Sequence, residues 1–479
     1  MGYAAQTQPF RSRLLADGFV VATARTGDHA FFSLEEFEQF CQSPATLPLR
    51  RQAELRSRFL MGEGTLSVGM RRLANSRISA KRETVSSGPS LHIIVPTLQC
   101  AHSCRYCQVS RSLHDQGYAM SPSDIDAACD SIFESTSPTL TVEFQGGDPL
   151  LRFDLIERAI LRIQARNATE RRRIRFVIAS TLHQLDEAMC AFLKDHGVHL
   201  STSIDGPREL HNRNRPTSGR DAYERTIAGI QLAREQLGPD AVAALMTTTK
   251  ASLGQPEDIV DEYVRLGFRE IFLRPLSTYG FAKRNQSLLS YTVEEFFYFY
   301  QRGLERVLHW NRQGVEIREV YASILLNKML STFDAGYVDL QSPTGAGASV
   351  LVYNYDGYVY PSDEARMLAE TGDTSLRMGK IGTPLPELFA SSTRIELARA
   401  SDVDEVAGCR ECPYNLFCAP NPVDAHAQFG TPFVPAHETE HCQRHMGLFD
   451  AMFMALRSAD EDVLDLFHQW ARPILDSKV

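Results

Sequence analysis

Strand-like segments alternate with helix-like segments from about Leu91 to Ser277. Six apolar runs are expected as strands, and they begin at Leu91, Thr139, Arg173, His199, Ala241 and Arg269. The helix expected after Ser121 has a capping box with Asp124 and proline at its first position. Nearly continuously apolar strands separated by helices predict a parallel sheet covered by helices, either open or closed into a barrel. In both architectures the ligand site lies at the carboxyl ends of the strands.

Length and composition exclude several classes of protein. A chain of 479 residues exceeds the usual size of one domain, and 43% hydrophobic and 23% charged residues are typical of a globular protein. The first twenty residues lack the apolar core of a secretory signal, and no apolar run approaches the ~18 residues of a membrane span. We therefore expect a cytoplasmic protein without a membrane partner. The formal net charge of -9 argues against a nucleic-acid partner.

The pattern divides the chain into five expected segments. Residues 1–65 are expected as an α+β region and residues 66–90 as a linker. The strand-helix core spans residues 91–285, and a helical bridge spans residues 286–335. Residues 336–479 are expected as a carboxyl-terminal domain that contains a hairpin at Asp356-Gly357 and ends in a helix from about Gln443 to Trp470.

Seven of the ten cysteines fall into two clusters. In a reducing cytosol, clustered cysteines indicate metal or redox chemistry before disulfides. The three others, Cys41, Cys129 and Cys190, sit beside apolar positions in helical segments, so we expect them to be small core residues.

The first cluster has the spacing C-x3-C-x2-C at Cys100, Cys104 and Cys107, in the loop after the first expected strand. It supplies three thiolates where a tetrahedral zinc site or a conventional iron-sulfur site takes four. A cluster held by three cysteines leaves one iron open for a small chelating ligand. The motif resembles that of radical SAM enzymes, whose 4Fe-4S cluster is chelated by S-adenosylmethionine (SAM).

Three further matches support this resemblance. FQGGDP ends the second strand and is similar to the Gly-Gly-Glu-Pro motif of the family, with Asp148 in place of Glu. The resemblance implies cofactor contacts along two loops and beside the cysteines. These contacts are Gly146, Gly147 and Asp148, then Ser203, Asp205 and Arg215 after the fourth strand, and Tyr106 between two cysteines.

Longer stretches, among them SCRYCQVSRS, EFQGGDPLL and SIDGPRELHNRNRP, resemble the radical SAM maturase of His-Xaa-Ser systems. The resemblance implies a partial (β/α)6 TIM-like barrel. It also implies an enzyme that reductively cleaves SAM to a 5'-deoxyadenosyl radical and modifies a ribosomally made precursor peptide by hydrogen abstraction. Expected partners are the precursor peptide, an electron donor such as flavodoxin or ferredoxin, and a second radical SAM maturase.

The second cluster consists of Cys409, Cys412, Cys418 and Cys442. It resembles the SPASM region of peptide-modifying radical SAM enzymes, which usually holds two auxiliary 4Fe-4S clusters. Here Pro422 and Ser362 stand where cysteines of the first auxiliary cluster are expected, so we predict one auxiliary cluster. Zinc bound by four cysteines is the main alternative.

Two further assignments concern Asp363 and the amino-terminal region. Asp363 follows Ser362 and is the candidate acid or base, with a solvated turn carboxylate as the alternative. The amino-terminal region resembles small winged-helix domains that bind leader peptides by strand addition, with a structural cap on the barrel as the alternative. In place of a peptide maturase, the chain could act on a small molecule, or serve as a non-catalytic iron-sulfur electron-transfer or binding protein.

Overall fold

A computed structural model describes residues 6–62, 66–86, 88–334 and 336–472. The chain forms two compact units. Unit 1 comprises residues 1–86, 322–345 and 398–479, and unit 2 comprises residues 87–321 and 346–397. The hairpin segment of the expected carboxyl-terminal domain thus belongs to the barrel unit, whereas the second cysteine cluster shares a unit with the amino-terminal region.

Unit 2 is built on a nine-stranded sheet with the order β12-β10-β9-β8-β7-β6-β14-β15-β16. The strands from β12 to β14 run parallel, and β15 and β16 are antiparallel at one edge. Their bounds are β6 (Leu91–Thr97), β7 (Thr139–Gly146), β8 (Arg173–Ala179), β9 (Val198–Ser203), β10 (Val242–Thr247), β12 (Leu273–Arg274), β14 (Val350–Tyr353), β15 (Tyr358–Tyr360) and β16 (Gly379–Lys380). The parallel sheet predicted from the sequence is confirmed.

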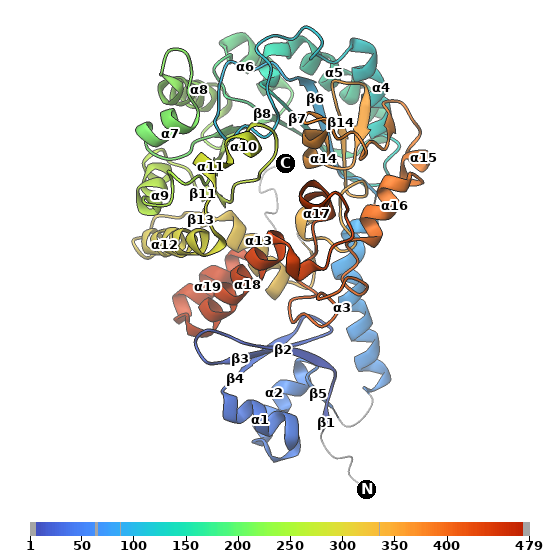
Figure 1. Cartoon of the computed structure of the whole chain (residues 1–479), viewed down its shortest axis with the longest axis vertical. Coiled ribbons are helices and arrows are strands. Elements are labelled where there is room, and N and C mark those ends of the chain that lie inside the picture. The colour runs from blue at the N-terminus through green and yellow to red at the C-terminus, as the bar shows by residue number, and fades with distance from the viewer. Residues whose placement is uncertain (1–5, 63–65, 87, 335, 473–479) are drawn as a thin grey trace. The chain divides into compact units, whose positions relative to one another are not determined.

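Helices cover the outer face of this sheet (Figure 1). On β7, Leu140, Val142 and Phe144 are buried against the helices, while Glu143 and Gln145 on the other face are only half-buried. On β7 the inner face is therefore more polar than the face covered by helices. The helices of this unit are α4 (Pro122–Ile132), α5 (Phe153–Glu170), α6 (Glu187–Asp195), α7 (Arg208–Asn214), α8 (Ala222–Leu237), α9 (Pro256–Arg265), α10 (Gly280–Arg284), α11 (Gln286–Leu289), α12 (Val293–Arg312), α14 (Asp363–Ala369), α15 (Leu385–Phe389) and α16 (Ser392–Arg399).

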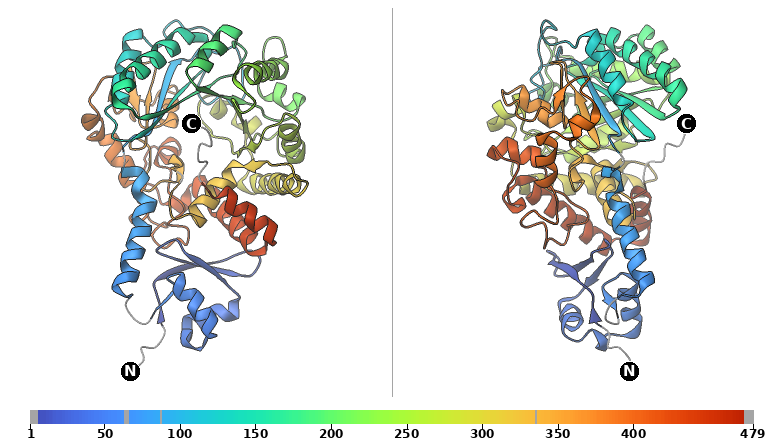
Figure 2. Two further views of the ribbon diagram at one scale, coloured as in Figure 1. Left: turned by 180° about the vertical axis from the view of Figure 1, so that it is seen from behind. Right: turned by 90° about the vertical axis from the view of Figure 1, so that its right-hand side faces the viewer.

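Unit 1 contains a three-stranded antiparallel sheet of β2 (Phe10–Leu14), β3 (Val20–Ala24) and β4 (His29–Phe32). Helices α1 (Leu34–Gln42) and α2 (Leu49–Ser57) share a core with this sheet, and Phe32 stacks on Phe40 at 4.9 Å. Two views show α18 (Glu440–Ser458) and α19 (Glu461–Trp470) beyond the other face of the sheet (Figure 2). The remaining elements are β1 (Gln6–Thr7), β5 (Met61–Gly62), α3 (Val68–Ser86), α13 (Val320–Leu330) and α17 (Pro422–Phe429).

The structure differs from the sequence-based expectations at four places. The sixth expected strand is split at Phe272, because β11 (Glu270–Ile271) pairs with β13 (Arg318–Glu319) while β12 pairs with β10. Residues expected as a linker form α3. The closing helix is two helices, because Asp460 caps α19. Cys41 is exposed, since the neighbouring Phe40 takes the core position of α1; Cys129 and Cys190 are buried as expected.

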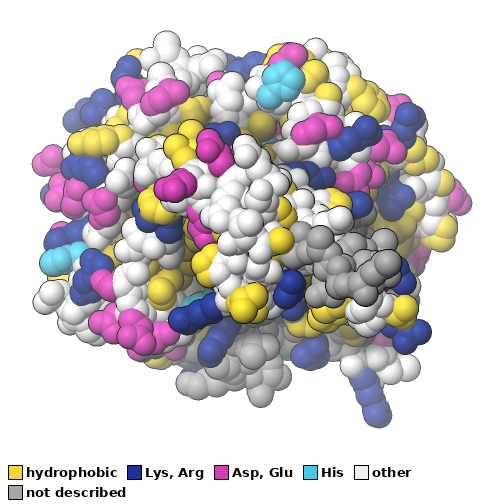
Figure 3. Space-filling view, turned by 90° about the horizontal axis from the view of Figure 1, so that it is seen from below, with side chains coloured by type: hydrophobic (Ala, Val, Ile, Leu, Met, Phe, Trp, Pro, Cys, Tyr) yellow, Lys and Arg dark blue, Asp and Glu magenta, His cyan; other side chains and the backbone are white. Residues whose placement is uncertain are grey.

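The described surface is mixed in charge. On the face seen from below, basic and acidic side chains are interspersed among scattered hydrophobic ones (Figure 3). None of the described helices combines the length and the apolar character that a transmembrane span requires.

Candidate active site and second cysteine site

The first cysteine cluster lies on the loop that follows β6. The loop folds back on itself, because Leu98 N donates to the carbonyl of Tyr118 (2.9 Å) and Cys100 N donates to the carbonyl of Ser112 (3.0 Å). The first barrel strand therefore delivers the three thiols on a tied loop at its carboxyl end.

The segment after α7 anchors the same loop. Ser103 N donates to the carbonyl of Pro216 and Arg105 N donates to the carbonyl of Asn214, both at 2.9 Å. Arg215 lies between these two acceptors. The backbone therefore brings the predicted arginine beside the cysteines.

All three thiols are free, and Cys100 is buried. Burial raises the pKa of Cys104 to about 11, while the nearby Arg215 guanidinium acts in the opposite direction. Metal binding would have to displace protons from these groups.

Tyr106, Asp205 and Arg215 form one buried network. The Tyr106 hydroxyl donates to Asp205 Oδ1 (2.9 Å) and accepts from Arg215 Nη1 (2.8 Å). Burial raises the pKa of Asp205, and Arg215 opposes this shift. Asp205 Oδ2 and Arg215 Nε are buried without a hydrogen-bond partner among the described residues. An orphaned acceptor and an orphaned donor in one network fit a ligand that carries both polar hydrogens and a carboxylate.

Gly146 and Gly147 form a close backbone contact with the start of the cysteine loop. Gly147 N donates to the carbonyl of Thr97 (2.9 Å), and Asp148 N donates to the carbonyl of Gln99 (2.7 Å). A Cβ atom on Gly147 would lie 2.3 Å from that same Gln99 oxygen, and Gly146 adopts a φ of +138°. Only glycine fits this approach.

The Asp148 side chain connects β7 to the loop after β8. Its two carboxylate oxygens accept from Ser180 Oγ (2.7 Å) and Thr181 Oγ1 (2.5 Å), and it is 1% exposed. The Asp148 side chain is therefore engaged within the protein, while the backbone of the motif, through which a cofactor contact was expected to remain possible, lies beside the cysteine loop. Ser180 and Thr181 directly follow β8, and no sequence motif marks them as partners of Asp148.

Ser203 ends β9, close in sequence to Asp205, and is half-buried. The sequence did not reveal a pair of histidines, one of them on the cysteine loop. His102 Nε2 lies 3.0 Å from His183 Nδ1. Burial lowers the pKa of His183 to about 4, so this imidazole is neutral at physiological pH. His102 Nδ1 and His211 Nε2 are buried and have no partner among the described residues.

Asp363 is the first residue of α14 and accepts from Arg366 Nε at 2.7 Å. Its side chain is 18% exposed, so it is not a solvated turn carboxylate. Ser362 stands where a cysteine of the first auxiliary cluster is expected. Its side chain caps this helix by accepting a hydrogen bond from Ala365 N. Glu143 on the inner face of β7 was not predicted; burial raises its pKa, and the nearby Asp363 charge raises it further.

The four cysteines of the second cluster line one cavity of about 250 Å³. The cavity is mostly apolar and lies in unit 1. Burial raises the pKa of Cys442 to about 11 and that of Cys409 to about 12. The structure therefore brings together all four predicted ligands, although the first and the last, Cys409 and Cys442, are 33 positions apart in the sequence.

Within the described ranges, no group of three or more His, Cys, Asp or Glu side chains is already gathered around the position of a single metal ion. Both cysteine sets nevertheless combine thiol donors with partly or fully buried surroundings. Buried thiols suit iron-sulfur clusters and zinc alike.

Comparison with known proteins finds a match to a family model in the core of unit 2. Residues 94–272 match the model of the radical SAM superfamily. This stretch contains the cysteine loop, the Gly146-Gly147 motif and the Tyr106 network. The parallel-sheet α/β fold of unit 2 is of the radical SAM type.

Several named proteins are similar to this chain over greater lengths. The cysteine-type anaerobic sulfatase-maturating enzyme of Clostridium perfringens (strain 13 / Type A) is 22% identical over 336 residues, which cover 67% of this chain and 84% of that enzyme. The solved structure "Native anSMEcpe with bound AdoMet" superposes with a TM-score of 0.64 at 17% identity, covering 79% of this chain and 99% of that one. Streptococcus suis SuiB bound to precursor peptide SuiA gives a TM-score of 0.55 at 13% identity, covering 92% and 100%.

Proposed function

We propose that this chain is a radical SAM enzyme that modifies a ribosomally made precursor peptide of the His-Xaa-Ser type. The observation that carries the proposal is the buried Tyr106-Asp205-Arg215 network beside the three cysteines, with one acceptor and one donor left unpaired. The match of residues 94–272 to the radical SAM superfamily model supports a 4Fe-4S cluster and SAM as the cofactors.

Cys100, Cys104 and Cys107 would hold the cluster, and the orphaned polar atoms fit SAM. When bound and supplied with an electron by the proposed donor, these groups would provide the radical chemistry that removes a substrate hydrogen. Arg215 would pair with the SAM carboxylate, and Asp205 and Ser203 would accept from its hydroxyl groups. Gly146 and Gly147 would present backbone groups to its amino end, while Tyr106 holds Arg215 and Asp205 in place and Asp148 secures the loop.

The second cysteine site would hold one auxiliary 4Fe-4S cluster. Its support is that Cys409, Cys412, Cys418 and Cys442 line a single cavity. The test is iron, sulfide and zinc analysis of a Cys100→Ala/Cys104→Ala/Cys107→Ala variant after anaerobic reconstitution. About four irons should remain per chain. Zinc without iron would assign the site to zinc instead.

Asp363 would exchange a proton with the substrate. Its ion pair with Arg366 keeps the carboxylate oriented, and Glu143 on the inner face of β7 is near enough to feel its charge. Asp363→Asn should lower product formation by about 10²-fold or more while SAM cleavage continues. Equal product formation by the variant would remove Asp363 from this role.

The edge strand β4 limits the ways in which a leader peptide would bind to the amino-terminal region. The outward carbonyls of β4 are already used, because His29 O accepts from Arg58 Nη1 and Phe31 O accepts from Arg51 Nη2, each at 2.5 Å. Strand addition at β4 would have to displace both arginines. A cavity of about 520 Å³ beside β4 is lined by Arg58, Arg77 and Lys81 together with Glu54 and Asp28, the ion-pair partners of Arg58 and Arg77, and it would offer side-chain contacts to a leader peptide instead.

A peptide substrate is supported by the names of similar proteins, since SuiB was solved with a precursor peptide. An electron donor such as flavodoxin or ferredoxin and a second maturase are the further partners that we propose. The test is mass analysis of a co-expressed His-Xaa-Ser precursor. A mass change that requires Cys104 supports the proposal. An unmodified peptide, with SAM cleavage intact, would favour a small-molecule substrate.

The non-catalytic alternative makes a different prediction. An electron carrier or binding scaffold would show iron-sulfur signals that do not respond to added SAM. A change of the electron paramagnetic resonance signal on SAM addition, absent in Arg215→Met, would exclude it. Arg213→Met, two positions away on α7, is a suitable control.

A further inference from the structure

The amino-terminal sheet contacts the loop that carries the second cysteine cluster. Arg11 on β2 donates through Nε to the carbonyl of Arg410, and Thr23 on β3 donates through Oγ1 to the carbonyl of Pro413, both at 2.7 Å. Each acceptor belongs to the residue that directly follows a cysteine of the cluster. Two side chains of one sheet thus fix the peptide groups beside two candidate ligands.

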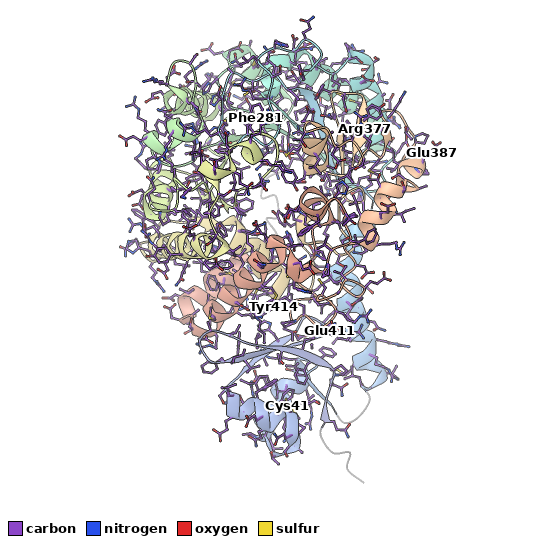
Figure 4. The ribbon with its side chains drawn as sticks, viewed as in Figure 1. Cys41, Phe281, Arg377, Glu387, Glu411 and Tyr414 are labelled. Carbon is purple, nitrogen blue, oxygen red and sulfur yellow. The ribbon has the colours of Figure 1, made fainter. Side chains whose placement is uncertain are left out.

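Arg13 on β2 adds a third contact. It pairs with both carboxylate oxygens of Asp450 on α18, at 2.7 and 2.8 Å. Asp450 Oδ1 also accepts from the hydroxyl of Tyr414 at 2.5 Å, and Tyr414 is fully buried in the cysteine loop. Tyr414 is labelled near the sheet and α18 in Figure 4. The loop, the helix and the sheet therefore share one ion-pair network.

Apolar contacts continue this interface beyond the ion pairs. His29 on β4 packs on Phe453 of α18 with ring centroids 5.0 Å apart. The Lys81 ammonium of α3 lies 5.6 Å from the ring centroid of Phe417, which is fully buried in the cysteine loop. The interface therefore includes Phe417, which lies between the second and third candidate ligands of the loop, as well as α18.

The charges at this interface suit a bound metal group. Four thiolates with either an iron-sulfur cluster or a zinc ion carry a net negative charge, and Glu411 on the cavity wall adds to it. Arg11 and Arg13 are the cations that the sheet contributes on this side. Outer groups that hold ligands in position commonly govern how firmly a metal is retained.

We propose that the amino-terminal sheet is the outer wall of the second metal site, with Arg11, Arg13 and Thr23 as positioning residues for its ligand loop. The inference rests on the proposed function of the four cysteines. Metal retention and docking of the sheet then depend on each other, since linkage between two binding events is reciprocal. The sheet has a role in the metal site in addition to any contact with a leader peptide.

The test measures how fast metal is lost to a chelator. In the Cys100→Ala/Cys104→Ala/Cys107→Ala background, the reconstituted full chain is placed in excess EDTA and its metal content is followed over time. Arg11→Met/Arg13→Met should lose metal at least about 10-fold faster than the background protein. The matched control is Arg457→Met, which breaks an ion pair with Asp17 between α18 and the β2-β3 turn. It should change the rate by about twofold at most.

A second measurement reads the linkage from the sheet. Hydrogen exchange of residues 10–24 should be faster in a Cys409→Ser/Cys412→Ser variant than in the metal-loaded parent. Thr23→Val, which removes only one hydrogen bond, should also speed metal loss, and it keeps the test decisive if the double arginine variant does not fold. If the arginine and threonine variants lose metal at the rate of the control and hydrogen exchange of the sheet is unchanged, the inference about the sheet is overturned while the metal site itself stands. A background protein that retains neither iron nor zinc would instead refute the metal site itself.

Discussion

The hydroxyl group of Tyr106 donates a hydrogen bond to Asp205 across 2.9 Å, although the two residues are 99 positions apart. Tyr106 lies on the cysteine loop after β6, and Asp205 lies after β9. The same hydroxyl accepts from Arg215. One aromatic side chain thus ties the candidate cluster loop to the candidate SAM contacts.

Removal of this hydroxyl should weaken SAM binding without removing the cluster. Tyr106→Phe keeps the ring but releases Asp205 and Arg215, a loss of about 1–2 kcal/mol that corresponds to roughly a tenfold higher Kd for SAM. Equilibrium dialysis of SAM against the reconstituted protein measures the Kd, and iron analysis should give the same content as in the parent. An unchanged Kd would show that the network does not serve SAM.

A methyl group on Gly147 should disrupt the start of the cysteine loop. The added Cβ would lie 2.3 Å from the carbonyl oxygens of Leu98 and Gln99, and the backbone would have to move. Gly147→Ala should lower the free energy of unfolding in urea by more than about 3 kcal/mol and reduce iron content. Gly254→Ala, which has open space around its Cβ position, should change stability by about 0.5 kcal/mol at most. Equal stability of the two variants would contradict the close approach.

The Asp148 carboxylate should contribute more to the stability of the fold than to the binding of SAM. Asp148→Ala leaves the hydroxyls of Ser180 and Thr181 without their charged acceptor, at a cost of about 2–4 kcal/mol. Asp154→Ala on α5, whose side chain is 62% exposed, should cost about 1 kcal/mol or less. Urea unfolding of both variants gives the comparison. A stable Asp148→Ala protein with lost SAM binding would assign the carboxylate to the cofactor.

His92 should make the fold sensitive to acid. It is fully buried on β6 between Tyr353 and the carbonyl of Pro89, and burial lowers its pKa to about 4. Since its pKa in the unfolded chain is about 6.5, only the unfolded state gains a proton as the pH falls from about 6.5 to 4, and stability is lost over that window. The full loss is about 3 kcal/mol.

Replacement of His92 should therefore flatten the dependence of stability on pH. Between pH 7.5 and pH 5.0, His92→Gln should lose about 2 kcal/mol less than the parent in urea unfolding. His114→Gln, on an exposed loop position, should follow the parent. Identical slopes for all three proteins would show that His92 is not the neutral buried group described here.

The sequence predicted the barrel well because its signals are local. The strands beginning near Leu91, Thr139 and Arg173 were marked by apolar runs, and parallel pairing places the loops after them at one edge. That rule alone was enough to bring Tyr106 and Asp205 toward one site. The split at Phe272 was not predictable, because the two halves of that apolar run pair with different strands.

Local sequence patterns could not predict the contacts between distant parts of the chain. The bond from Arg11 to the carbonyl of Arg410 joins residues 399 positions apart, and neither residue stands in a motif. The pairing of Asp363 with Arg366 fits the spacing of a helix, but the sequence indicated a turn there. Arginines on a surface and arginines in a buried network look the same in one sequence.

The central claim is that this chain uses its three-cysteine cluster to cleave SAM. The direct measurement is 5'-deoxyadenosine formed by the anaerobically reconstituted full chain with SAM and dithionite, quantified by liquid chromatography and mass spectrometry. We predict formation of 5'-deoxyadenosine by the parent and none above background by Cys104→Ala, while Cys41→Ala, at an exposed cysteine outside both clusters, matches the parent. No 5'-deoxyadenosine from a parent protein that holds its iron would contradict the claim.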